Sequence, residues 1–360
     1  ALALARVRPH PGEPMDERRV AVLSAALETS PTGSERALLL AALAIEQTFV
    51  APITVVRSLV DEAIECAGAG DDAVLARVLA STPWVRLATA DPDDLMAGSA
   101  VHLEVARRLR DPAAVFDATS HRVLAALTTG DAAAIDGSVS ELVRLAHEMG
   151  SADRSWQALT YQAIQTLQQG DLSAAHRAVD EASVVAGEHA ITEGRASRAA
   201  LLFGIRFEEG RLGELVDELH AVADTAPAPS IFRAAALLAA AESGRAGEVQ
   251  RSLTDVVDAL QHEPAGWFTL PALAFYAQAA SQHQHVAVAR PLLDRLATYR
   301  PQFVFGGGAV WGHLHHHMGT LAALLDKPQA HWLLASAEDA HTRAGARIWA
   351  ERSRQALERG

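Results

Sequence analysis

The four residues Thr128-Thr129-Gly130-Asp131 decide the fold, because closely similar turns return along the chain. Gln168-Gln169-Gly170-Asp171 is the next of them. The later turns occupy residues 208–211, 242–245, 281–284 and 324–327. Their spacing is regular at 34 to 42 residues (170 − 130 = 40, 244 − 210 = 34, 326 − 284 = 42). Self-similarity at this period is typical of helix–turn–helix repeats stacked into a solenoid.

The residue types in these turns indicate helical hairpins. Each turn follows an apolar run rich in Ala and Leu and precedes a second amphipathic run. Glycine, as at Gly130, ends a helix in a left-handed conformation without steric penalty. The aspartate that follows, as at Asp131, can cap the next helix through its side-chain oxygen. In the second run, Leu142, Leu145 and Met149 share one helical face, which we expect to pack against a neighbouring repeat.

We therefore predict an all-α fold, a right-handed superhelical solenoid of about eight tetratricopeptide-like helical hairpins. The proline-marked stops Asp91-Pro92 and Ala51-Pro52 extend the repeat toward the amino terminus. Residues 16–360 are expected to form a single repeat domain, with a bend near 225–230, where Pro227 and Pro229 lie. Residues 1–15 contain three prolines and are interpreted as a linker from an absent upstream domain.

Composition narrows the classes of function. The 360 residues are 49% hydrophobic and carry a formal net charge of −13. Because binding to nucleic-acid phosphates needs clustered Lys and Arg, this charge argues against a direct nucleic-acid partner. Cys66 is the only cysteine, so no disulfide framework is expected, which fits a cytoplasmic location. No uninterrupted apolar run approaches the ~18 residues of a membrane span, so no membrane partner is predicted.

The sequence motifs of common enzyme classes are not found. A Walker A loop ends in Lys-Ser/Thr, but the only lysine, Lys327, is followed by Pro328. The nucleophile elbow, the His-Glu-x-x-His helix, the EF-hand loop and the dinucleotide-binding glycine motif are also missing. The triple glycine at 306–308 is interpreted as a flexible connection between helices, because no strand is expected before it. We predict a non-catalytic chain without a cofactor.

A histidine cluster is the sharpest local feature: His313, His315, His316 and His317. On a helix, His313 and His317 would lie one turn apart and could share a metal ion. A zinc site also needs a third and usually a fourth ligand, for which only His283 and His285 are near in sequence. Because helix-surface histidines are more often solvated or hydrogen-bonded, no metal site is predicted. A third interpretation is that some of them line a pocket or form a pH-sensitive contact.

Large aromatic residues accompany the two glycine- and proline-rich interruptions of the repeats: Trp267, Phe268, Phe303, Phe305 and Trp311. Such residues either fill the gap between diverging helices or line a site for a ligand or peptide. With His313 and His317, they are our candidates for contact with a ligand or partner. The remaining tryptophans are expected in the core: Trp84, Trp156, Trp332 and Trp349.

The carboxy-terminal residues suggest a family. Gly306-Gly307-Gly308-Ala309, the run 318–324 and the run 343–352 (Arg-Ala-Gly-Ala-Arg-Ile-Trp-Ala-Glu-Arg) resemble the helical-repeat region of large bacterial signal-transduction ATPases. These proteins carry a LuxR-type DNA-binding domain or an adenylate/guanylate cyclase as output module. The resemblance covers nearly all of the chain, but only the last fifty or so residues are distinctive. The four histidines depart from the family pattern, which puts a shared ligand in doubt.

The resemblance implies a sensory or scaffolding segment whose chemistry lies in other modules. The expected function is to bind a small-molecule effector or a partner and to relay occupancy to the ATPase and output modules of the parent regulator. One alternative is a structural oligomerisation scaffold without a small ligand, which would form homo-oligomers. A second is a metal-dependent protein built on the histidine cluster.

Overall fold

The turns that mark the repeats hold the conformation expected of them in the computed structural model. The structure describes residues 16–29, 33–48, 51–68, 71–89, 91–225, 230–262 and 266–359. Each predicted turn has one left-handed residue, including the two turns without glycine: Gly130 (φ 74°), Gly170 (80°), Gly210 (68°), Gly244 (74°), Gln284 (52°) and Asp326 (51°). Asp131 and Asp171 accept hydrogen bonds from the amides of Ala134 and Ala174. The turn chemistry predicted from the sequence is confirmed.

The described residues form nineteen α-helices, one short 3₁₀ helix and one two-stranded sheet. The predicted all-α solenoid of helical repeats is therefore confirmed. The chain divides into two compact units, residues 1–125 with 264–268, and residues 126–263 with 269–360. The expected linker at residues 1–15 and the prolines of the expected bend, at 226–229, lie outside the described residues.

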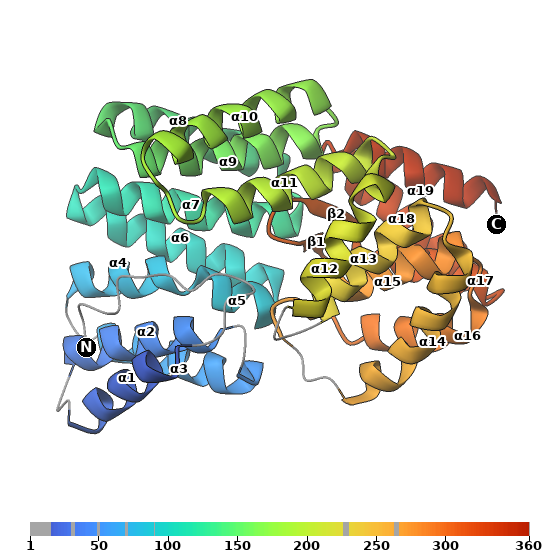
Figure 1. Cartoon of the computed structure of the whole chain (residues 1–360). Helices are drawn as coiled ribbons and strands as arrows, with labels where there is room; N and C mark the ends of the chain where they lie inside the picture. Colours follow the sequence, from blue (N-terminus) through green and yellow to red (C-terminus); the bar gives the residue numbers. More distant parts are fainter. Residues whose placement is uncertain are drawn as a thin grey trace. The chain divides into compact units, whose positions relative to one another are not determined.

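The first unit contains α1 to α6 and most of α7 (Figure 1). Their bounds are α1 Glu17–Thr29, α2 Gly33–Gln47, α3 Ile53–Ala67, α4 Asp72–Ser81, α5 Pro83–Thr89, α6 Pro92–Leu109 and α7 Pro112–Thr129. Asp91 caps α6 and Pro92 opens it, as the proline-marked stop predicted. Apolar residues of α2, α3 and α4, such as Leu40, Ala63 and Val78, form its largest described core cluster.

The second unit runs from the end of α7 to α19. Its elements are α8 Ala132–Met149, α9 Ala152–Gln168, α10 Leu172–Glu188, α11 Gly194–Glu208, η2 Leu212–Leu215, α12 Val216–Thr225, α13 Ser230–Glu242, α14 Ala246–His262, α15 Thr269–Gln282, α16 Val286–Leu296, β1 Phe303–Phe305, β2 Val310–His313, α17 Leu314–Leu324, α18 Gln329–Arg343 and α19 Arg347–Arg359. Helix α9 packs against α10, α17 against α18, and α18 against α19. These are the antiparallel pairs that the repeat predicts.

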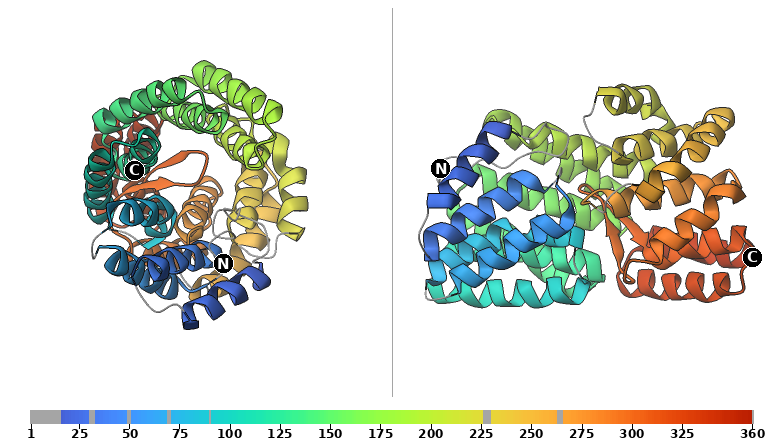
Figure 2. Two further views of the ribbon diagram at one scale, coloured as in Figure 1. Left: turned by 90° about the vertical axis from the view of Figure 1, so that its left-hand side faces the viewer. Right: turned by 90° about the horizontal axis from the view of Figure 1, so that it is seen from below.

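The segment around the three glycines is an ordered β-hairpin, where the sequence predicted a flexible connection. Strands β1 and β2 are antiparallel, with Phe303 opposite His313 and Phe305 opposite Val310. The Gly306 amide donates to the Ala309 carbonyl, and Gly307 has a φ of 73°, so the glycines form the tight turn. In Figure 2 (left) the hairpin, in orange, lies on the inner side of the green helices.

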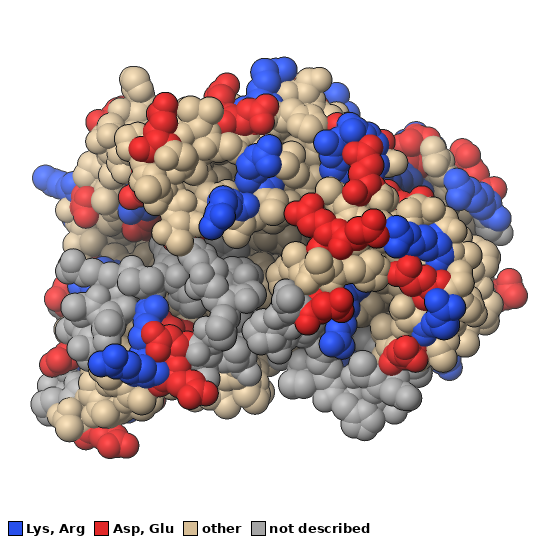
Figure 3. Space-filling model, in the orientation of Figure 1, with Lys and Arg blue, Asp and Glu red and all other residues tan. Residues whose placement is uncertain are grey.

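Acidic side chains outnumber basic ones in the sequence, 44 to 31. On the face drawn in Figure 3, acidic and basic side chains are interspersed. Ion pairs form within and between helices, as between Arg108 of α6 and Asp72 of α4. Arg144, for example, bonds Glu141 and Glu148 on its own helix. None of the described helices combines the length and the apolar composition needed to cross a membrane.

Candidate functional site

The β-hairpin forms the centre of the candidate site because it contacts helices far from it in the sequence. Every residue of both strands is buried. Gly308 lies directly on the backbone of Ala200 in α11, where an added Cβ would be 2.4 Å from the carbonyl carbon. Ala309 lies against Gly204 of the same helix, where a Cβ would be 2.7 Å from its methyl group. The hairpin thus packs on the inner side of α11 at a distance that only small residues permit.

Aromatic rings pack directly on two other glycines, Gly130 and Gly312. A Cβ on Gly130, at the end of α7, would lie 2.2 Å from the Phe303 ring. A Cβ on Gly312, in β2, would lie 2.5 Å from the Trp349 ring of α19. Both glycines have positive φ angles, 74° and 75°. Because glycine lacks a side chain, each position can adopt the left-handed backbone conformation and also allow an aromatic ring to approach closely.

Trp311 is the centre of an aromatic cluster beneath the hairpin. Its ring lies 5.2 Å from Phe203, 5.2 Å from Phe207 and 4.6 Å from Phe275, measured between centroids. Phe207 also stacks on Trp349 at 6.0 Å. Trp311 is 3% exposed. These rings join α11, α15, β2 and α19, so the cluster holds together elements from three parts of the repeat array.

The histidines form a buried hydrogen-bond network rather than a helical row. The His313 amide donates to Nε2 of His341, 2.7 Å away. Because that nitrogen accepts, the neutral ring carries its proton on Nδ1, which lies 3.1 Å from Ser353 Oγ and donates to it. The same hydroxyl lies 2.9 Å from Nδ1 of His316 and is left to donate to it. One serine of α19 therefore connects histidines of α17 and α18.

The other two histidines of the cluster have separate partners. Nε2 of His317 lies 2.7 Å from the Trp311 carbonyl, so it donates a hydrogen bond. Nδ1 of His315 lies 2.9 Å from Ser336 Oγ, and its ring lies 5.1 Å from Trp332. His317 is 1% exposed, whereas Trp332 is 61% exposed. His315 therefore connects the buried network to an exposed aromatic ring.

Burial keeps these imidazoles neutral. The pKa of His313 is lowered to about 3, mainly by burial and in part by neighbouring positive groups, and burial lowers that of His317 to about 4. Burial and repulsion from neighbouring imidazoles also place the pKa values of His316 and His341 well below the usual value. The cluster is therefore uncharged at neutral pH.

The cluster has no arrangement suited to a metal ion. No three His, Cys, Asp or Glu side chains in the described parts of the chain are placed to bind one. The expectation that His313 and His317 lie one turn apart on a helix is wrong, because His313 ends β2 and caps α17 by accepting from the His315 amide. One ring nitrogen of each of His313, His315, His316 and His317 is engaged by an amide, a hydroxyl or a carbonyl, and Nδ1 of His317 is buried without a hydrogen-bond partner among the described residues.

An acidic pair with one arginine adjoins the aromatic cluster. Nη1 of Arg352, in α19, lies 3.0 and 2.9 Å from the two carboxylate oxygens of Glu208, at the end of α11. Its guanidinium group lies 4.4 Å from the centre of the Phe207 ring and 4.8 Å from that of Trp349. Glu242, at the end of α13, accepts from the Leu212 amide at 3.2 Å. Burial raises the pKa of Glu242 to about 7, and repulsion from Glu208 adds to the shift.

The predicted contact residues fall in two places. Phe303, Phe305, Trp311, His313 and His317 come together in and beneath the hairpin, and all five are buried. Trp267 and Phe268 belong to the first compact unit, where their rings form a T-shaped pair at 4.6 Å. Contact with a ligand stays a prediction for all seven. For the five buried residues it would require the hairpin to move.

The prediction of a core position is wrong for Trp332, which is largely exposed, and right for Trp349, which is 3% exposed. Trp156 is half-buried, and the side chain of Trp84 lies outside the described residues. The difference arises because Trp332 lies on the outer side of α18, next to His331, which is also exposed.

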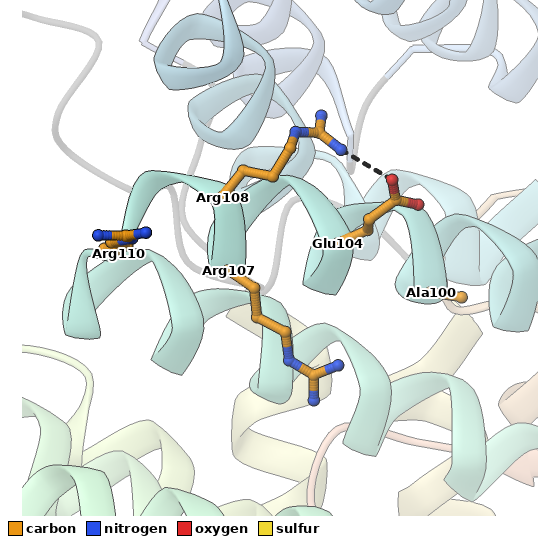
Figure 4. A pocket seen from close by; sticks show the side chains of 5 residues that line it. All are labelled: Ala100, Glu104, Arg107, Arg108 and Arg110. Atoms are coloured by element: carbon orange, nitrogen blue, oxygen red, sulfur yellow. Dashed lines mark hydrogen bonds and ion pairs between the residues drawn. The ribbon is translucent and has the colours of Figure 1, made fainter.

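A second surface feature, on α6, is a shallow depression lined by Ala100, Glu104, Arg107, Arg108 and Arg110 (Figure 4). Arg108 bonds Asp72 at 2.8 and 2.9 Å and Glu104 at 2.8 Å. Arg107 extends from the opposite side of the helix. The arginines do not converge on one point, so the depression is not a built anion site.

No protein-family model matches this sequence, and no curated protein is significantly similar to it. The carboxy-terminal resemblance therefore remains an expectation from the residues themselves.

We did not predict the helical residues that contact the hairpin, Phe203, Phe207 and His341, or the polar groups beside them, Glu208, Glu242, Arg352 and Ser353. One pattern in the repeat could have indicated Glu208 and Glu242. The position two residues before the turn glycine is polar in four successive turns, as Thr128, Gln168, Glu208 and Glu242. Thr128 and Gln168 are buried, and Gln168 reaches the Ala344 carbonyl. At Gln168 and Glu208 this position faces the carboxy-terminal segment.

Proposed function

We propose that this chain is the sensory or protein-interaction region of a bacterial signalling or transcriptional regulator. It binds an effector or a partner protein and relays that occupancy to ATPase and output modules outside this chain. It is non-catalytic and acts in the cytoplasm. The support is the repeat architecture together with the carboxy-terminal resemblance, since arrays of this kind present extended surfaces to binding partners.

The observation that carries the proposal is the long-range contact of the hairpin and α19 with earlier repeats. In an ordinary solenoid each repeat contacts only its neighbours. Here Phe303 packs on Gly130, Ile348 on Gly170, and Arg352 bonds Glu208. A ligand that binds more tightly with these contacts made, or with them broken, would shift the whole unit between two states.

The test compares the response of the parent regulator before and after removal of residues 16–360. We expect the output activity to lose its dependence on the effector or partner. If the effector response is unchanged without these residues, the proposal is wrong. A thermal-shift screen of the chain against metals, nucleotides, sugars and metabolites identifies effectors beforehand, because a ligand at 100 times its Kd stabilises a fold by about 2.7 kcal/mol.

One observation favours the alternative of a scaffold without a small ligand. Trp332 is 61% exposed on α18, and tryptophan is enriched among the residues that dominate protein interfaces. Sedimentation of the wild-type chain and of Trp332→Ala separates the two functions. A homo-oligomer that dissociates on this substitution, with no ligand found in the screen, supports the scaffold.

A further inference from the structure

The inner ends of α11 and α13 present two carboxylates at equivalent places in the repeat. Glu208 and Glu242 each lie two residues before a turn glycine, Gly210 and Gly244. The Glu208 side chain is 6% exposed. Glu242 is half-buried and has its carboxylate on the Leu212 amide. Two acidic groups are thus held in partly desolvated positions on adjacent helices, which is costly without nearby positive charge.

The carboxy-terminal helix supplies a single cation to this pair. Arg352 donates a hydrogen bond to Oε1 of Glu208 and forms an ion pair with its carboxylate, whose Oε2 accepts no hydrogen bond from the described residues. The guanidinium group lies over the Phe207 ring, on which Trp349 of the same helix also stacks. Among the ion pairs of the described residues, none includes Glu242. One guanidinium group therefore faces two acidic side chains, and it forms an ion pair with only one of them, Glu208.

Other charged groups near α11 and α13 are engaged elsewhere. On the outer side, Glu209 bonds Arg206, and Arg245 bonds Asp217. In the turn after α15, His283 bonds the Ala241 carbonyl. The histidines of α17 and α18 that surround Arg352 are neutral at pH 7, as described above. Arg352 is therefore the principal positive charge facing the two carboxylates.

We propose that the inner end of α11 at Phe207 and Glu208, with Glu242 of α13 nearby, is a docking site for an arginine-bearing helix, which α19 fills in this structure. The partner that competes for it is a helix of the same chemistry, with arginine next to an aromatic residue. Charge complementarity identifies this partner, because the unmatched Glu242 favours a helix that brings more positive charge than α19. The proposal rests on the proposed function and names the class of partner that the region senses.

Chemical rescue tests the guanidinium site in the full chain. Arg352→Ala removes the guanidinium group and leaves both carboxylates and the Phe207 ring in place. We expect about 20 mM methylguanidinium to raise the melting temperature of this variant by a degree or more over an equal concentration of ammonium chloride. Arg354→Ala is the matched control, because Arg354 lies on the same helix but bonds the surface residues Glu338 and Glu351.

The double variant Glu208→Gln/Arg352→Ala should lose the rescue, because the carboxylate that orients the guanidinium group is gone. Equal responses of Arg352→Ala and Arg354→Ala to methylguanidinium would overturn the site. If Arg352→Ala does not fold, Arg352→Lys takes its place. Lysine keeps the charge but not the planar group, so we expect faster hydrogen exchange of the 347–359 amides than in the wild-type chain.

Competition tests the partner. The probe is a synthetic peptide with the sequence of residues 345–360. It should bind Arg352→Ala about tenfold more tightly than the wild-type chain, because the variant leaves the docking site unoccupied more often. In the wild-type chain it should speed the hydrogen exchange of residues 347–359. Binding that is equal in both proteins, or that survives Glu208→Gln, would contradict the proposal.

These experiments separate the inference from the proposed function. They are carried out on the purified chain and require no parent regulator. If the site fails them while the parent still loses its effector response on removal of the region, the sensory function stands and its partner has a different chemistry. If the site passes and the parent is unaffected, the docking site serves another role.

Discussion

The backbone amide of His313 donates a hydrogen bond to Nε2 of His341, which joins the end of β2 to α18 through an imidazole that must stay neutral. A protonated ring would place a second N–H against this amide. The contact between these two residues therefore depends on pH, and it shares that property with the rest of the buried histidine network.

We expect the chain to lose stability as the pH falls from about 6.5 toward 4. The folded-state pKa values of His313 and His317 are lowered to about 3 and about 4, whereas an unfolded histidine titrates near 6.5. The unfolded state therefore binds more protons in this window, and the stability present above pH 6.5 is lost below it. Each such histidine contributes a slope of up to about 1.4 kcal/mol per pH unit. Urea denaturation at several pH values measures it.

His317→Gln provides the control for this pH dependence. Glutamine keeps a donor for the Trp311 carbonyl but does not titrate, so the slope of unfolding free energy against pH should decrease by about one proton. His147→Gln, at an exposed position on α8, should leave the slope as in the wild-type chain. Equal slopes in the His317→Gln variant and the wild-type chain would mean that the network does not govern the acid response.

Glu242 should give the opposite pH dependence. Its folded-state pKa is raised to about 7, so the stability that it contributes is present below about pH 4.5 and is lost as the pH rises through 7. We expect Glu242→Gln to be less sensitive than the wild-type chain to a change from pH 6 to pH 8.5, as measured by melting temperature. Glu218→Gln, on the exposed side of α12, should behave as the wild-type chain does.

Gly312→Ala tests the approach of β2 to α19. The substitution forces an alanine into a φ of 75° and places its Cβ 2.5 Å from the Trp349 ring. We expect a loss of roughly 2 to 5 kcal/mol in unfolding free energy, from backbone strain and overpacking together. Gly345→Ala is the matched control, since its φ is 68° but nothing lies within 4 Å of the added carbon. It should lose only the strain, about 1 to 2 kcal/mol.

The tryptophans offer a comparison of buried and exposed rings. Trp311→Ala should cost about 3 to 5 kcal/mol, because it opens a cavity among Phe203, Phe207 and Phe275. Trp332→Ala should change the unfolding free energy by no more than about 0.5 kcal/mol, since its ring is mostly in solvent. Chemical denaturation of both variants measures the difference. Similar losses in the two would show that Trp332 has a structural role.

The local parts of the fold could be predicted from the sequence. Gly130, Gly170 and Asp131 determine their turns through their own backbone and side-chain preferences, so their effect is visible in four consecutive residues. Even Gln284 and Asp326, which replace glycine, keep the left-handed conformation because the flanking helices require it. Information of this kind does not depend on distant contacts.

The candidate site could be predicted only in part, because its geometry depends on residues far apart in the chain. The strands Phe303–Phe305 and Val310–His313 contain Phe, Val and Trp, which favour strands, but an isolated hairpin this short is marginally stable. Its order depends on contact with Ala200 and Trp349. The histidines likewise receive their partners from Ser336 and Ser353, on two later helices. Sequence spacing suggested a helical row of imidazoles and could not supply these partners.

The packing of Phe303 on Gly130 and of Ile348 on Gly170 has a consequence for how the second unit unfolds. An open array of repeats frays from its ends, since losing a terminal repeat removes only one interface. In this unit the last helix also supports repeats near the beginning, so detaching it removes several interfaces at once. The repeats from α8 to α19 should therefore melt as a single cooperative block, with one transition and no significantly populated intermediate.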